Sequence, residues 1–300
     1  MKFIYLLFLI AIAAFFSVVP SVMSADGTLI GFTYSGKVFA IDEVTGQGTF
    51  INSLGWSVVS LNSAASDSRG VIYTAPKHPT SGPTIQELKK VIQVDPVTGD
   101  STFRVNIGFA DVRGMSFSPD GKLYAIFDGG RDPASHEFLT DRLYIINLSS
   151  NCSRTSCYTL VGSTGANGLQ SLAFSPDGRL FSWDVNRGLA VLNTSTGAAT
   201  FIDVDDSIHF PDIQGLVFTP RGKLFGCRDT LSTIDLATGV ASEIGGKGYS
   251  DIRGLVFLEG ELALPEKSFL ELILSRFYLI VFLFIAVFVF VNKLKLFRKN

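Results

Sequence analysis

The 300-residue sequence is poor in residues that enzymes often use in catalysis, with only three histidines and three cysteines. It contains no Gly-x-Ser-x-Gly elbow, no Walker loop and no His-Glu-x-x-His motif. The histidine spacing fits no zinc or EF-hand pattern, so we predict neither a metal site nor a cofactor. A basic stripe is also lacking. Because five of the 25 lysines and arginines lie at residue 2 and within 293–300, the rest of the chain carries a net charge of −7. Since affinity for nucleic acid depends largely on Lys and Arg contacts to phosphate, we predict no nucleic-acid partner.

The first of two apolar runs lies at the start of the chain. Lys2 is followed by an uncharged apolar run over residues 3–19, which ends at Pro20, and small residues follow at Ser24 and Ala25. This order of a basic start, an apolar stretch and small residues is typical of a secretory signal, so we predict a signal peptide over residues 1–25. An uncleaved N-terminal anchor is the alternative.

The second apolar run lies at the end of the chain. Residues 277–291 are apolar without interruption, and residues 272–275 extend the run to about the 20 residues that cross a bilayer. Four basic residues follow within 293–300, which the positive-inside rule places in the cytoplasm. We therefore predict a linker over 265–271, a transmembrane helix over 272–292 and a cytoplasmic tail. The body, residues 26–264, is then outside the cytoplasm, in a periplasm or at the cell surface, on a single-pass membrane protein.

A short motif, Leu264-Pro-Glu-Lys-Ser268, stands just before the second run. A Pro-Glu motif, an apolar span and a basic end together resemble the sorting tails of bacterial surface proteins, particularly the PEP-CTERM type. The match is incomplete, because Lys267 stands where that family has a second proline. A plain membrane anchor remains our interpretation of this segment.

The body consists of repeats. Five apolar stretches end in Asp or Asn, and in four of them a Thr-Gly pair follows. The Asp or Asn positions are spaced by 53, 52, 46 and 42 residues, and they are Asp42, Asp95, Asn147, Asn193 and Asp235.

A second motif alternates with the first. Residues 112–124 (Val-Arg-Gly-Met-Ser-Phe-Ser-Pro-Asp-Gly-Lys-Leu-Tyr) match residues 169–181, and weaker copies occupy 213–225, 252–262 and 66–73. Alternating apolar residues predict strands, and Pro-Asp-Gly predicts tight turns in which glycine adopts a positive φ. Two hairpins in 40–50 residues correspond to one propeller blade. We therefore predict an all-β fold, a five-bladed β-propeller of four-stranded blades, with residues 27–34 as an extra strand that completes the last blade.

These repeats resemble the NHL, YVTN and related propeller repeats of exported proteins, over nearly the whole body. The resemblance implies the fold and says little about activity, because such rings include lyases, lactonases, sugar-binding proteins and scaffolds.

Propeller geometry sorts the connections between strands onto two faces. The short Thr-Gly and Ser-Pro-Asp-Gly turns open on one face, whereas longer connections over 75–89, 128–141 and 203–212 open on the other. Binding residues often lie on such loops. We expect the ligand-binding residues there, and the candidates are Trp56, His78, Asp128, Arg131, His136, Asp205 and His209.

The cysteines predict a disulfide. Cys152 and Cys157 lie five residues apart in a polar loop, and in an exported protein we expect them to pair and close an a–b turn. Cys227 is expected on an outer strand as a buried free thiol.

Three functions fit these observations. We favour a binding or scaffold module for a protein or carbohydrate partner, because catalytic motifs are missing and the body is anchored. A metal-assisted hydrolase or lyase with its site over the central channel is the alternative, and it requires acidic or histidine side chains that converge at the channel mouth. A structural stalk without a specific ligand is the third.

Overall fold

A computed structural model describes residues 27–54, 59–77, 90–108, 111–149, 152, 154–202 and 210–260. The predicted signal peptide, linker, transmembrane helix and cytoplasmic tail all lie outside these residues. Within the described ranges, no helix is long and apolar enough to cross a membrane.

The described residues form twenty strands in five four-stranded antiparallel sheets, which confirms the predicted propeller. We call the sheets blades 1 to 5 and name their strands a to d from the inside outward. Blade 1 contains β4 (Val59–Ser66), β5 (Ile72–Lys77), β6 (Lys90–Val94) and β7 (Ser101–Asn106). Blade 2 contains β8 (Val112–Phe117), β9 (Leu123–Phe127), β10 (Arg142–Ile146) and β11 (Tyr158–Ser163).

The other three blades follow the same plan. Blade 3 contains β12 (Ala173–Phe174), β13 (Leu180–Asp184), β14 (Gly188–Leu192) and β15 (Ala199–Phe201). Blade 4 contains β16 (Gly215–Phe218), β17 (Leu224–Cys227), β18 (Leu231–Ile234) and β19 (Ala241–Gly245). Blade 5 contains β20 (Ile252–Glu259), β1 (Gly27–Thr33), β2 (Lys37–Ile41) and β3 (Gly48–Ser53).

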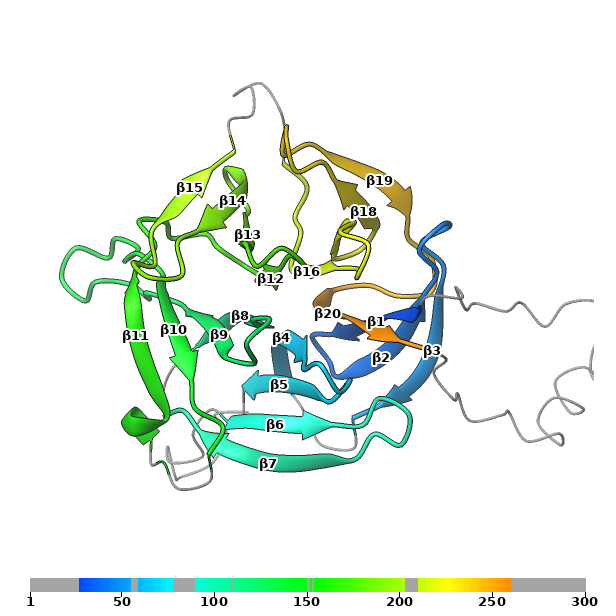
Figure 1. The fold of residues 1–300 in the computed structure, drawn as a ribbon, viewed down its shortest axis with the longest axis horizontal. Coiled ribbons are helices and arrows are strands. Elements are labelled where there is room, and N and C mark those ends of the chain that lie inside the picture. Colours follow the sequence, from blue (N-terminus) through cyan, green and yellow to red (C-terminus); the bar gives the residue numbers. More distant parts are fainter. Residues whose placement is uncertain are drawn as a thin grey trace, which may run out of the picture. The chain divides into compact units, whose positions relative to one another are not determined.

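The blades close into a ring around a common axis (Figure 1). The inner strands β4, β8, β12, β16 and β20 contact one another in this order, and β20 contacts β4. Blade 5 joins the two ends of the body, because β1 pairs with β20 on one side and with β2 on the other. The prediction that the segment starting at Gly27 completes the last blade is therefore confirmed.

The hydrophobic core lies between the blades. Each of five clusters of buried side chains combines residues from two adjacent blades, so every blade covers the apolar faces of its neighbours. Between blades 3 and 4, for example, Phe181 and Trp183 pack with Leu216 and Phe218. The middle strands are covered on both faces, and β9 and β13 are buried along their whole length.

The Asp or Asn of the first repeat motif ends each c strand and organises the c–d turn. In blade 5 the Asp42 carboxylate accepts hydrogen bonds from the Val44 and Thr45 amides at 3.1 and 2.7 Å. Asp95, Asn193 and Asp235 bind the corresponding amides of their own turns. The Ser-Pro-Asp-Gly turns join strands a and b on the same face, which we call the turn face. The b–c and d–a connections lie on the opposite face, the loop face.

Two sequence predictions about the cysteines need correction. The Cys152–Cys157 disulfide is present, but it closes the c–d connection between β10 and β11 and not an a–b turn. Blade 2 lacks the Thr-Gly turn, and this disulfide loop replaces it. Cys227 is buried as expected, but it ends β17, which lies between β16 and β18 and is not an outer strand.

Candidate functional site

A ring of five polar residues surrounds the mouth of the central channel on the loop face. In each blade the same pattern, an apolar residue, then Arg, Gln or Asn, then Gly or Ser, lies in the inner strand or just before it. The second residues are Asn62, Arg113, Gln170, Gln214 and Arg253. Three of them, Arg113, Gln214 and Arg253, line the channel.

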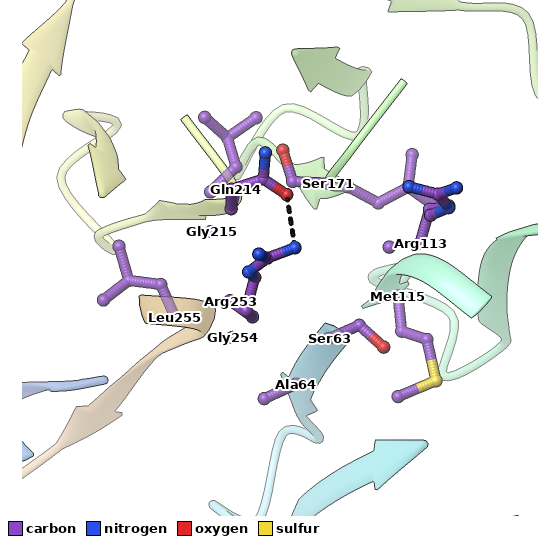
Figure 2. Close-up of a pocket in the computed structure, with 13 residues that line it drawn as sticks. Ser63, Ala64, Arg113, Met115, Ser171, Gln214, Gly215, Arg253, Gly254 and Leu255 are labelled. Carbon is purple, nitrogen blue, oxygen red and sulfur yellow. Dashed lines mark hydrogen bonds between the residues drawn. The ribbon is translucent and has the colours of Figure 1, made fainter. Parts of the chain in front are cut away.

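Hydrogen bonds join this ring between neighbouring blades. Arg113 donates through Nη1 to Oε1 of Gln170 at 3.3 Å, and Arg253 donates through Nη1 to Oε1 of Gln214 at 3.3 Å. Figure 2 shows the second of these bonds, between Gln214 and Arg253. Each arginine therefore bridges two blades and keeps the mouth narrow.

Carboxylates surround the two arginines. Asp128, at the end of β9, forms a salt bridge with Arg113 at 2.5 Å, and Asp251 accepts a hydrogen bond from Nε of Arg253 at 2.7 Å. Arg228 contacts Asp212 and also lies 3.4 Å from Asp251. The mouth thus has a rim of paired positive and negative groups.

Asp141 lies within this rim but is almost fully buried, with 2% of its surface exposed. Its carboxylate accepts hydrogen bonds from the Leu169 amide at 3.0 Å and the Gly129 amide at 3.3 Å. Burial, with a further contribution from Asp128, raises its pKa to about 6, although the two amide bonds act in the opposite direction. Because both oxygens bind backbone amides, Asp141 connects blade 2 to the chain that enters blade 3.

A narrow cavity lies in the channel below the ring. Its volume is about 10 Å³, room for roughly one water molecule. Residues in or just before the inner strands form its walls, among them Ser63, Arg113, Ser171 and Arg253 (Figure 2). The channel is narrow because inner strands approach closely: a Cβ at Gly114 would lie 2.5 Å from the Ser171 carbonyl carbon.

Of the seven residues predicted to bind ligand, three are described, and only Asp128 lies at the channel mouth. Arg131 and His136 belong to a small hairpin between β9 and β10, where Arg131 pairs with Phe138. The Arg131 guanidinium stacks over the Phe138 ring at 3.9 Å. Trp56, His78, Asp205 and His209 lie outside the described residues. Their predicted roles stay predictions.

The hairpin repeats the c–d turn in a new place. Asp132 accepts hydrogen bonds from the Ala134 and Ser135 amides, and the His136 amide binds the Asp132 carbonyl, as Gly99 binds Asp95. His136 therefore occupies the glycine position of this turn and has a φ of 60°. Its turn position explains this histidine without a ligand.

The polar ring was not among the predicted site residues, which lay on the long loops. Its signal in the sequence is the Arg, Gln or Asn that recurs at the second position of every inner-strand motif. No group of three or more His, Cys, Asp or Glu side chains suited to a metal ion occurs within the described ranges.

The sequence matches no protein-family model, and it matches no curated protein sequence. Solved structures resemble the fold. One is a symmetrical protein whose de novo evolutionary emergence is shaped by folding constraints, with a TM-score of 0.50 and 18% identity over 76% of this chain and 97% of that one. TolB from Acinetobacter baumannii has a TM-score of 0.46 and 15% identity, over 80% of this chain and 57% of TolB. A gluconolactonase from Xanthomonas campestris has a TM-score of 0.45 and 14% identity, over 74% and 77% of the two chains. Likenesses at such low identity concern the fold alone, and the resemblances to NHL or YVTN repeats and to PEP-CTERM tails stay predictions.

Proposed function

We propose that this protein is a binding module, anchored in a membrane and displayed outside the cytoplasm, which binds a protein partner at the rim of its loop face. The supporting observation is the pair of Arg–Gln hydrogen bonds at the channel mouth, to which blades 2 to 5 contribute one side chain each. The cavity beneath it, about 10 Å³, is far smaller than the roughly 300–1,000 Å³ of small-molecule sites. A partner would therefore contact the rim from outside and would not be enclosed.

The charges of the rim favour a partner with basic groups. Six carboxylates pair with or act on three guanidinium groups, so within this set negative charge exceeds positive charge by three. The carboxylates belong to Asp111, Asp128, Asp141, Asp212, Asp229 and Asp251, and the guanidinium groups to Arg113, Arg228 and Arg253. An excess of one sign attracts partners of the other sign and makes association sensitive to salt.

The two ends of the described body lie on the face opposite this rim. Strand β20 ends and β1 begins at the position of an a–b turn, because Gly27 pairs with Glu259. Both ends of the described body therefore emerge on the turn face. Neither end of the body crosses the rim.

Charge reversal tests the proposal. In cells that produce the full chain, the double variant Asp212→Lys, Asp229→Lys is compared with Asp120→Lys, Asp177→Lys, which makes the same charge change on the turn face. Partners are crosslinked on intact cells and quantified by mass spectrometry. We expect the amount of crosslinked partner to fall at least about tenfold in the rim variant and to stay unchanged in the control. Equal recovery from both variants would contradict the proposal.

Purified full-length protein tests the alternative, a metal-assisted hydrolase or lyase. Metal analysis, followed by activity assays on ester and lactone panels, is repeated after alanine substitution of His78, His136 and His209. Stoichiometric metal that disappears in these variants together with activity would favour the enzyme.

A further inference from the structure

Two buried hydroxyl groups line the channel without a partner. Ser63 in β4 and Ser171, just before β12, occupy the same position of the inner-strand motif and are only 2% and 4% exposed. Neither hydroxyl has a hydrogen-bond partner among the described residues. Figure 2 shows the two serines on different sides of the cavity. Since a buried polar group without a partner costs roughly 1–3 kcal/mol, two such hydroxyls at one cavity favour a group in the channel that accepts hydrogen bonds.

Arg113 adds a third unused donor. Its Nη1 and Nη2 atoms bind Gln170 and Asp128, whereas its buried Nε has no partner among the described residues. Arg253 also lines the cavity and contributes a second guanidinium group. The groups that face this cavity are therefore mostly N–H and O–H donors.

No carboxylate lines the cavity among the residues that the structure describes. The lining residues include two arginines and no Asp or Glu. Asp128 and Asp251 bind the outer sides of these arginines, and Asp111 and Asp141 act on Arg113 from outside the cavity. A group held here must accept hydrogen bonds, must be about as large as one water molecule, and is favoured by two nearby positive charges.

We propose that the central channel binds one monoatomic anion, chloride in the cell, in the cavity lined by Ser63, Ser171, Arg113 and Arg253. The anion would accept hydrogen bonds from buried donors of this lining and partly neutralise the two guanidinium groups. The acidic rim lowers the local concentration of anions, so we expect millimolar affinity. This site is independent of the partner proposed for the rim.

The first test measures thermal unfolding of the full chain in detergent while sodium chloride or bromide replaces sodium gluconate at constant ionic strength. Gluconate is too large for the cavity. Because a ligand that binds only the folded state stabilises it, we expect Tm to rise saturably by roughly 3–6 °C. The double variant Ser63→Ala, Ser171→Ala should lose this rise without losing stability in gluconate, because it removes two unpaired hydroxyls.

Ser118→Ala is the matched control. The Ser118 hydroxyl lies on the turn face and binds the Lys122 carbonyl at 3.1 Å. This variant should have a lower Tm in every salt but the same rise with halide. A halide response that is absent in the wild type, or unchanged in the double serine variant, would overturn the proposal.

Crystals of the wild-type protein grown in sodium bromide give a second readout that needs no variant. An anomalous bromine peak in the channel, between the two serines and Arg113, is the expected result. Density for a water molecule without an anomalous signal would show that water alone satisfies these donors, and the proposal would fail.

Discussion

Asp141 connects two blades at the loop face, but its carboxylate is buried and its pKa is raised. Its carboxylate joins blade 2 to the chain that enters blade 3 through the amides of Gly129 and Leu169. Because the side chain is buried beside Asp128, its pKa rises to about 6. The folded protein therefore holds this proton more tightly than the unfolded chain does.

The pH dependence of stability follows from this shift. Between about pH 4 and 6 the folded state still binds the proton that the unfolded state has lost, so the contribution of Asp141 to the free energy of unfolding falls as pH rises, by about 3 kcal/mol at most. We expect the difference in stability between wild type and Asp141→Asn to shift in favour of the variant from pH 4 to pH 7, as measured by urea denaturation.

Asp132→Asn is the comparison for this experiment. The Ser135 and Ala134 amides lower the pKa of Asp132, so its contribution is lost as pH falls and the slope has the opposite sign. A wild-type and Asp141→Asn pair with parallel pH profiles would show that this carboxyl keeps an ordinary pKa.

At the scale of elements, the c–d turns hold adjacent blades together. A Cβ at Gly197 would lie 2.7 Å from the Gly162 carbonyl carbon in blade 2, so a glycine here lets the turn of blade 3 approach blade 2 closely. Glycine also adopts the positive φ of 82° that this turn requires. In blade 2 the disulfide loop and the short 3₁₀ helix η1 (Arg154–Cys157) replace this turn, and η1 contacts β7 of blade 1. Cys157 is fully buried in the cluster between blades 1 and 2.

Removal of the disulfide should therefore weaken one blade junction. We expect Cys152→Ser, Cys157→Ser to lower the free energy of unfolding by roughly 2 kcal/mol, the value for a short closed loop. Mild reductant should have the same effect on the wild type. Burial raises the pKa of the Cys227 thiol to about 12 and leaves this thiol unreactive. The control variant Cys227→Ala should therefore lose as much stability in reductant as the wild type does. No change in denaturation midpoint on reduction would contradict this role.

The sequence predicted the strands and turns better than the place of each hairpin within its blade. Strands and turns depend on neighbouring residues, so the repeats identified five blades and the ends of the c strands. The motifs could not show which hairpin was inner, and the disulfide was accordingly placed in the wrong turn. The polar ring depends on five strands that are distant in sequence, and nothing local to Gln170 or Arg253 shows that they share one mouth.

At the scale of the whole molecule, close contact between inner strands sets the width of the channel. At the third position of the inner-strand motif, Gly254 faces Ala64 of the next blade, and a Cβ there would lie 2.7 Å from the Ala64 Cβ. Gly114 is equally close to Ser171. Small residues at this position allow five blades to close with a cavity for about one water molecule.

Gly114→Ala tests this packing. The added methyl group meets backbone atoms that have no room to move, so we expect a loss of about 2 kcal/mol in the free energy of unfolding. Ser171→Ala changes the same position of blade 3, where a Cβ already fits, and should cost far less. Equal stability of the two variants in guanidinium denaturation would contradict close packing as the determinant of channel width.

Blade 5 has a consequence for synthesis. Its inner strand is nearly the last part of the body to leave the ribosome, whereas its other three strands are the first. The ring thus stays open, with β1 and β4 lacking their neighbour, until residue 259 is available. A chain that stops before residue 252 should expose these edges and be degraded or aggregate, so only full-length chains should accumulate in the folded form.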